Sequence, residues 1–397
     1  MKNTKLFRLL AVLFAVTLFA AACGSSESAD DAAGDDATTE DTTADDSSDD
    51  ASDDADDSSD DATEDDAEEV DVTQGDTVSA IRDRGELNCG VSGQAVAFSV
   101  TQPDGSQVGF DADYCRAVAA AILGDAEAVN FVPLTSAERF TAVQTGTVDV
   151  LMRNTTWTQS RDTDLGMDFG PTTYFDGQQL MARVSDGFSE ASTVADIDGA
   201  LVCTQTGTTT EKNIVDAANA AGVTITLQQF EEANQVQEAF TSGACDVFTT
   251  DGSALVGRKA ELQPADQEWV IFPSSPISKE PLGPTYGQND SVFADIVNWT
   301  VYATLIADEN GVNSGNVADV LADTENTSAE VLRLLGGEGE LQTLMGLEAD
   351  AFYNVIEQVG AYSEIYERHL GPVGLTIEGS FNALWTDGGL MYPPPAR

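Results

Sequence analysis

Short apolar runs alternate with helix-like stretches along the chain after residue 80. Examples in chain order are ELNCGV (86–91), YCRAVAAAILG (114–124), VNFVPL (129–134), AERFTAVQTG (137–146) and VDVLM (148–152). Apolar runs that alternate with helical patterns are typical of α/β units, in which helices cover the faces of a mostly parallel sheet. Residues 75–397 are numerous enough for two domain-sized units. The alternation therefore predicts an α/β fold.

A faint internal repeat links two parts of this region. Residues 142–154, AVQTGTVDVLMRN, match residues 239–251, AFTSGACDVFTTD, at Ala, Gly, Asp and Val without a gap. Each segment has the pattern of a helix closed by glycine, then a strand, then a polar residue, although this order is generic. The match places Asn154 opposite Asp251, each just past the carboxyl end of a strand, where open α/β sheets bind ligands. It predicts two lobes with polar residues on both walls of a cleft.

The stretch RNTTWTQSR, residues 153–161, follows a strand-like run and carries hydroxyls, amides and a closing arginine. Arg161 offers a planar fork that can hold a carboxylate through two parallel hydrogen bonds, and Asn154 and Thr156 can add others. Asp251 offers a negative acceptor for an ammonium group. Ordinary interpretations remain open, namely a surface pair of Arg161 with its neighbour Asp162 and a turn at Asp251. Together, an anion clamp and a cation acceptor on two lobes match the backbone end of a free amino acid.

The segment ALVCTQTGTTTEKNIVDAANAAG, residues 200–222, has the pattern of a strand, a glycine turn and a helix. Thr208 and Glu211 have the spacing of a capping box, with threonine as the N-cap. One interpretation is simply a well-capped helix. The other is an anion site, because the start of such a helix offers free backbone N–H groups, hydroxyls and the positive end of the helix dipole.

The first 22 residues have a basic start, a short apolar run and a small-residue end. This pattern predicts a signal peptide over 1–22 rather than a membrane span, for which the apolar run is short. The sequence AAACG at 20–24 resembles a bacterial lipoprotein cleavage site with Cys23 as the lipidated first mature residue. Ala20 stands where such sites usually carry leucine, so cleavage without a lipid remains an alternative.

Residues 24–74 contain 23 Asp or Glu and no Lys or Arg. Such a segment has too little apolar surface to offset its ordering entropy, so residues 23–74 are predicted to form a lipid anchor and a disordered acidic tether. Residues 75–397 carry 46 acidic and 14 basic residues. This acidic balance argues against nucleic acid or an anionic membrane surface as a partner, and leaves the lipid as the only membrane contact.

Four further cysteines lie in the region after residue 75: Cys89, Cys115, Cys203 and Cys245. An even count in an exported chain suggests disulfides, with three possible pairings. Pairing by half, Cys89–Cys115 and Cys203–Cys245, puts one bridge in each unit; free buried thiols are the alternative. No Cys-x-x-Cys is present and His369 is the only histidine, so no metal site and no cofactor are predicted.

The chain closely resembles the solute-binding proteins of polar amino-acid ABC importers, most of all the general L-amino-acid-binding subgroup. The resemblance covers nearly all of residues 76–397. The stretches that carry it are RGELNCGVS, GFDADYCRAVAAAI, RFTAVQTGTVDVLMRNTTWTQSRD, VCTQTGTTTE, CDVFTTD, ISKEPLGP, NALWTDGGLMY and PPPAR.

The resemblance implies a two-lobed, type II periplasmic-binding-protein fold with two hinge strands and a helical C-terminal extension. Lobe 1 would comprise residues 75–177 and 281–397, and lobe 2 residues 178–280. The hinges are expected near Gly177–Leu180 and Ser278–Gly283. The region after about residue 311 adds amphipathic helices, whose apolar spacing indicates a docking core rather than a separate site.

The resemblance also implies a set of ligand-binding residues: Ser136, Arg139, Asn154, Thr156, Arg161, Gly207, Thr208, Thr209 and Asp251. Arg161 and Thr209 would hold the α-carboxylate with help from Thr156 and Thr208, while Asp251 and the Asn154 region would receive the α-ammonium. Ser136 and Arg139 occupy places that contact the side chain in relatives that bind acidic amino acids. Many relatives place an aromatic ring after the first strand, where this chain has Ala95, with Phe98 beyond it.

The leading hypothesis is an exported, lipid-anchored, monomeric binding protein, and not an enzyme. It would capture L-amino acids, with polar or acidic side chains favoured, at the outer face of the cell membrane and deliver them to the permease subunits of an ABC importer. Two alternatives are a dehydratase-like enzyme on the same scaffold and a sensor that presents its ligand to a receptor. An enzyme would need a poised acid or base in the cleft.

Overall fold

The computed structural model describes residues 75–397. The predicted signal peptide at 1–22, the predicted lipidation of Cys23 and the predicted acidic tether at 23–74 lie outside the described residues. Within the described residues, no helix is long and apolar enough to cross a membrane.

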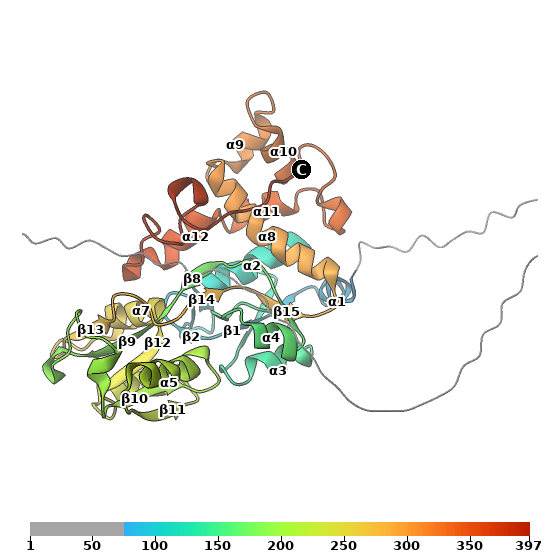
Figure 1. Cartoon of the computed structure of the whole chain (residues 1–397). Helices are drawn as coiled ribbons and strands as arrows, with labels where there is room; N and C mark the ends of the chain where they lie inside the picture. The colour runs from blue at the N-terminus through green and yellow to red at the C-terminus, as the bar shows by residue number, and fades with distance from the viewer. Residues whose placement is uncertain (1–74) are drawn as a thin grey trace, which may run out of the picture. The chain divides into compact units, whose positions relative to one another are not determined.

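Two five-stranded sheets organise the described chain (Figure 1). The first sheet has the order β5 (Val129–Pro133), β1 (Leu87–Val91), β6 (Val150–Leu151), β15 (Thr285–Gly287), β7 (Met167–Phe169). The second has the order β11 (Thr226–Phe230), β10 (Leu201–Gln205), β12 (Val247–Asp251), β9 (Gln178–Arg183), β13 (Trp269–Phe272). In each sheet the first three strands are parallel and the last two add antiparallel pairs. The α/β prediction is confirmed, and each sheet is the centre of one lobe.

Helices alternate with the strands in both lobes, and most of them pack against the sheets. In the first lobe they are α1 (Asp76–Arg84), α2 (Phe110–Leu123), α3 (Arg139–Gln144) and α4 (Gln159–Asp164). In the second lobe they are α5 (Thr209–Ala221), α6 (Ala233–Thr241) and α7 (Gly252–Leu262). A small three-stranded sheet of β2 (Gln94–Ala95), β3 (Ser99–Thr101) and β4 (Gln107–Val108) precedes α2.

The internal repeat corresponds to one structural step that occurs in both sheets. The backbone of Asp149 donates to the carbonyl of Asn88 at 2.9 Å, and its carboxylate accepts from the Asn88 N–H at 2.8 Å. Asp246 makes the same pair of bonds with Leu201, at 2.9 and 2.8 Å. The aspartate shared by the two segments therefore sets β6 against β1, and β12 against β10.

Two strands connect the sheets. β8 (Tyr174–Asp176) leads into β9 of the second sheet, and β14 (Glu280–Leu282) returns the chain towards β15 of the first. β8 and β14 pair antiparallel, with Phe175 opposite Pro281. β14 lies within the second expected hinge, 278–283, whereas β8 ends at Asp176, one residue before the first expected hinge, 177–180.

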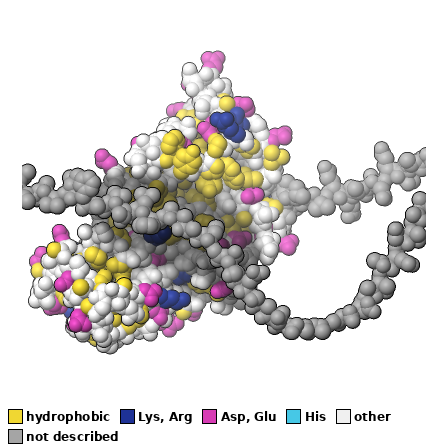
Figure 2. Space-filling model, in the orientation of Figure 1, with side chains coloured by type: hydrophobic (Ala, Val, Ile, Leu, Met, Phe, Trp, Pro, Cys, Tyr) yellow, Lys and Arg dark blue, Asp and Glu magenta, His cyan; other side chains and the backbone are white. Residues whose placement is uncertain are grey.

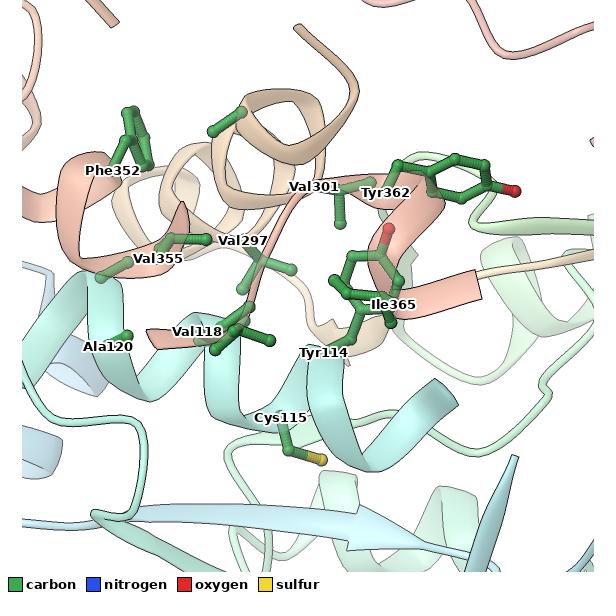
Figure 3. Close-up of a cluster of buried hydrophobic side chains, with 14 of the residues drawn as sticks. Tyr114, Cys115, Val118, Ala120, Val297, Val301, Phe352, Val355, Tyr362 and Ile365 are labelled. Atoms are coloured by element: carbon green, nitrogen blue, oxygen red, sulfur yellow. The ribbon is translucent and has the colours of Figure 1, made fainter. Parts of the chain in front are cut away.

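The C-terminal helices lie on one side of the first lobe, and the longer ones among them pack against α2 (Figure 1). They are α8 (Ser291–Glu309), α9 (Val317–Ala322), α10 (Ala329–Leu334), α11 (Ala351–Gln358) and α12 (Tyr362–His369). Figure 3 shows Val118 of α2 facing Val297 of α8, Val355 of α11 and Ile365 of α12 in one cluster of buried side chains. The expectation of a docking core is confirmed.

The C-terminal segment also contacts the first connecting strand. The side chain of Asn382 accepts from the Phe175 N–H at 2.6 Å and donates to the Phe175 carbonyl at 3.1 Å. Tyr174 stacks on Tyr366 of α12 with ring centroids 6.1 Å apart. The extension therefore braces the strand β8 that leaves the first lobe.

The visible surface is acidic. Figure 2 shows Asp and Glu side chains scattered over the described residues, with few Lys or Arg among them. This distribution matches the charge balance of the sequence.

Both disulfides have the predicted pairing, in which each bridge joins two cysteines of the same lobe. Cys89 of β1 is joined to Cys115 of α2, and Cys203 of β10 is joined to Cys245, which precedes β12. Each bridge ties a central strand to another element of its own lobe, with sequence separations of 26 and 42 residues.

Removal of either disulfide is expected to lower the melting temperature. Loops of these lengths stabilise by roughly 3–4 kcal/mol each in the chain-entropy model. Paired Cys→Ser variants, C89S/C115S and C203S/C245S, should therefore each melt several degrees lower by calorimetry, and a reductant should lower the melting temperature of the wild type but not that of the quadruple variant. Equal melting curves for wild type with and without reductant would contradict the assignment.

Candidate ligand-binding site

A cavity of about 50 Å³ is lined by residues from both lobes. A single water needs roughly 10–15 Å³ of such space, so the cavity has room for a small molecule. Its lining residues from the first lobe are Ser92, Ala95, Ser136, Arg139, Arg153, Asn154 and Thr156. Those from the second lobe are Gln205, Thr208, Thr209, Thr210, Ala233, Val236, Phe248, Thr250, Asp251, Ala254 and Arg258.

Asp251 supplies the negative charge of the cavity. It ends β12, is only 6% exposed, and lies 3.5 Å from the side-chain nitrogen of Asn154 across the cleft. Burial raises the pKa of Asp251 well above its ordinary value, and the neighbouring carboxylates of Asp176 and Glu280 raise it further. The charged form is therefore unfavourable without a cation, and an ammonium group placed beside Asp251 would offset this cost.

Asn154 is held in position by its backbone. Its φ of 32° is unusual for a residue other than glycine, and asparagine tolerates such angles better than most side chains. Its N–H donates to the carboxylate of Asp111 at 2.8 Å. This contact turns the chain after β6 and presents the Asn154 amide to Asp251.

The N-terminus of α5 contributes Thr208, Thr209 and Thr210 to the cavity wall. Thr208 is the N-cap, and its hydroxyl accepts from the Glu211 N–H at 3.1 Å. Thr208 is thus the predicted N-cap, but the Glu211 carboxylate accepts from the Gly207 N–H at 2.8 Å rather than from the N–H of Thr208, so the reciprocal bond of the predicted capping box is displaced by one residue. The Thr209 hydroxyl lies 3.4 Å from that of Thr156 in the first lobe. N–H groups of the first helical turn lack intrahelical acceptors, and the helix dipole favours a negative group there.

Arg161 lies beside this helix start rather than in the cavity wall. It is 7% exposed, donates to the Thr156 carbonyl at 2.8 Å, and lies 5.1 Å from the centre of the Phe140 ring. It lines a neighbouring depression together with Thr208 and Thr209. Burial lowers the pKa of Arg161 to about 10, which leaves the guanidinium charged at neutral pH.

Three other arginines line the cavity itself. Arg139 donates to the Thr155 hydroxyl at 3.4 Å, Arg153 to the Leu134 carbonyl at 2.8 Å, and Arg258 to the Gln94 carbonyl at 3.0 Å. Among residues 75–397, none of the three has a carboxylate oxygen within 4.0 Å. A buried positive charge without an acid partner is costly unless a ligand supplies the negative charge.

The family model for bacterial extracellular solute-binding proteins, family 3, matches residues 87–372. The chain belongs to this family. This solute-binding protein is 43% identical to the glutamate/glutamine/aspartate/asparagine-binding protein BztA of Rhodobacter capsulatus over 322 residues, which covers 81% of the chain and 93% of BztA. It is 42% identical to the general L-amino acid-binding periplasmic protein AapJ of Rhizobium johnstonii over 324 residues, with the same coverages.

A solved structure supports the same relationship. A periplasmic binding protein of an ABC transporter from Brucella ovis, with glutathione bound, is 43% identical. It covers 82% of this chain and 100% of its own, with a TM-score of 0.77. The two-lobed fold expected from the sequence is therefore shown.

Of the nine expected ligand-binding residues of this solute-binding protein, seven lie in the cavity wall: Ser136, Arg139, Asn154, Thr156, Thr208, Thr209 and Asp251. Arg161 and Gly207 do not line it. Gly207 has a φ of +73°, and an added Cβ would lie 3.2 Å from the Cα of Ala137 in the first lobe. The close approach of the two lobes, rather than a wall position, accounts for glycine there.

Sequence reasoning missed Arg153 and Arg258. Arg153 is the first residue of the RNTTWTQSR stretch, and its position directly after a strand-like run was the available signal. Arg258 follows Asp251 and Ala254 at helical spacing, and all three line the cavity on the N-terminal turns of α7. That spacing was the available signal.

The loop after the first strand has Ala95 where many relatives have an aromatic ring, as the sequence indicates. Ala95 lines the cavity, so no aromatic ring covers the ligand there. Phe98 is buried and packs edge-to-face against Phe110 and Tyr174. Its ring belongs to the core of the first lobe and supports the cavity only indirectly.

Proposed function

We propose that this protein binds a free L-amino acid between its lobes and delivers it to an ABC importer. The observation that carries the proposal is the apposition, in one cavity, of a buried carboxylate and a helix N-terminus. An α-amino acid carries an ammonium and a carboxylate on one carbon, and this arrangement offers a partner to each.

The proposed ligand geometry follows from the charges. The α-ammonium lies beside Asp251 and the Asn154 amide oxygen. The α-carboxylate accepts hydrogen bonds from backbone N–H groups at the start of α5, at Thr209, and from the hydroxyl of Thr156, with Arg161 as a positive charge immediately behind. Gly207 keeps the α5 start close to the first lobe.

The names of the relatives support this proposal. BztA is named for glutamate, glutamine, aspartate and asparagine, and AapJ for general L-amino acids. The Brucella ovis protein holds glutathione, whose γ-glutamyl end carries a free α-ammonium and α-carboxylate. These names favour polar or acidic side chains here.

Transport requires opening as well as binding. Rotation of the lobes about β8 and β14 would open and close the cavity, and closure would exclude water and strengthen the contacts of Asp251. We place the lobe limits at 75–177 with 281–397 and at 178–280. A permease could then distinguish the closed form by surfaces of both lobes.

The proposed location of the protein in the cell rests on its family and on the sequence pattern of its N-terminus. We propose that the chain is exported, anchored at the outer face of the cell membrane through Cys23, and acts as a monomeric binding protein rather than as an enzyme. Incubation with amino or keto acids followed by product analysis tests the last point, because any turnover would favour the dehydratase-like alternative.

A thermal-shift screen of the twenty amino acids tests the proposed function. A ligand at 100 times its Kd stabilises by about 2.7 kcal/mol, which corresponds to a rise on the order of 5 °C in melting temperature. We expect a subset of L-amino acids to give this rise. Matched α-keto acids, which lack the ammonium, and amino-acid amides, which lack the α-carboxylate, should not; equal shifts with the keto acids would contradict the proposal.

A further inference from the structure

We propose that Arg258 recognises a negative charge on the ligand side chain, so that the site selects α-amino acids whose side chain ends in a carboxylate. The proposal rests on the proposed function, because it concerns the far part of the same cavity. The carboxylate can belong to an acidic amino acid or to the end of a γ-glutamyl peptide.

The environment of Arg258 leaves part of its guanidinium unused. The residue is 3% exposed, its Nη2 donates to the Gln94 carbonyl at 3.0 Å, and its Nη1 is buried without a hydrogen-bond partner. The guanidinium lies 5.9 Å from the centre of the Phe248 ring. Burial alone lowers the pKa of Arg258 to about 10, so it remains a cation at neutral pH.

Two partly buried arginines outside the cavity wall do have acid partners. Arg116 pairs with Asp113 at 3.1 Å, and Arg183 pairs with Asp186 at 2.7 Å. Within residues 75–397, Arg258 has no carboxylate within 4.0 Å. An unpaired buried charge with a free donor is expensive in a fold, and its position in the cavity wall assigns the missing partner to a ligand.

The first lobe offers matching donors in the same cavity. The Nε of Arg139 and the hydroxyl of Ser136 are also buried without partners. Together with Arg258 Nη1 they make three unused donors, and a carboxylate has about four lone-pair positions on two oxygens. A carboxamide has only one acceptor oxygen, and its NH₂ group would add donors where the wall already provides them.

Arg258 also lies where the lobes meet. Its acceptor, the Gln94 carbonyl, belongs to the first lobe, and the Gln94 side chain donates to Glu232 of the second lobe at 2.6 Å. A side-chain carboxylate held by Arg258 and Arg139 would therefore bridge the lobes directly. Acidic ligands should favour the closed arrangement more than neutral ligands of the same shape.

Titration calorimetry with L-glutamate and L-glutamine tests this inference. The wild type should prefer glutamate at least tenfold. In Arg258→Gln, the affinity for glutamate should fall at least tenfold and that for glutamine less than threefold, so that the preference disappears. Arg258→Lys keeps the positive charge but loses the planar guanidinium, so it should retain part of the preference for glutamate. This variant tests the role of Arg258 if Arg258→Gln does not fold.

The controls separate this inference from the proposed function. Arg183→Gln alters an arginine of the same lobe that lies outside the cavity wall, and it should leave the preference unchanged. Glutathione in parallel titrations identifies the source: an Arg258 dependence seen with glutathione but not with free glutamate assigns the carboxylate to a peptide end. Equal losses for glutamate and glutamine, or no loss with either glutamate or glutathione, would overturn the role of Arg258. Failure of the wild type to bind any of the three ligands would instead count against the proposed function.

Discussion

Asp251→Asn is expected to weaken the binding of every amino-acid ligand by about 30-fold or more. Truncation of one partner of a buried charge pair typically costs 2–5 kcal/mol or more. The substitution keeps the size of the side chain and its contact with Asn154, but it removes the charge that balances the ligand ammonium. Titration calorimetry measures the loss.

The same substitution should stabilise the unliganded protein. Asp176 and Glu280 surround Asp251, and burial together with their charges raises its pKa above the ordinary value of 3.8. The folded wild type therefore holds an extra proton at acid pH and loses stability as the pH rises from about 4 towards that raised pKa. The gain in melting temperature from Asp251→Asn should be small at pH 4 and should grow as the pH rises towards the raised pKa. Retained affinity, or a loss of stability that is independent of pH, would show that Asp251 has another role.

Arg161→Ala is expected to lower amino-acid affinity about 100-fold while the fold survives. The change removes the positive charge behind the start of α5 and frees the Thr156 carbonyl that Arg161 now holds. It lies outside the hydrophobic cluster of Val143, Leu151 and Phe169 that supports this part of the lobe. Calorimetry for affinity and circular dichroism for folding measure the two effects.

A matched control comes from Arg183. It too stacks on a phenylalanine, at 4.9 Å from the Phe240 ring, and donates to backbone carbonyls. Arg183→Ala should therefore lower stability without changing affinity. If Arg161→Ala and Arg183→Ala behave alike, Arg161 is a structural residue, and the helix start and the Thr156 hydroxyl alone hold the carboxylate.

Local patterns predicted much of the fold and part of the cavity. The shared aspartates Asp149 and Asp246 lie inside the matched segments, so the repeat carries the strand positions that bring Asn154 and Asp251 together. The cap at Thr208 depends on residues within four positions of it. Such features depend on residues that are close together in the sequence, and periodicity and spacing detect patterns over such short segments.

Contacts between segments that lie far apart in the sequence could not be predicted in this way. Arg258 reaches the cavity because α7 docks beside the Gln94 turn, which is 164 positions away in the chain. Arg161 lies behind the cavity wall because its short helix directs it to the carbonyl of Thr156. Neither position follows from residue type, since an arginine serves equally well as ligand clamp, backbone anchor or surface charge.

The proposed function depends most on an amino-acid zwitterion held between Asp251 and the start of α5. A crystal structure with bound L-glutamate tests this directly. It should place the α-ammonium within hydrogen-bonding distance of the Asp251 carboxylate, the α-carboxylate at the first turn of α5, and the side-chain carboxylate at Arg258. A ligand bound outside this cavity, or one whose ammonium lies away from Asp251, would contradict the account.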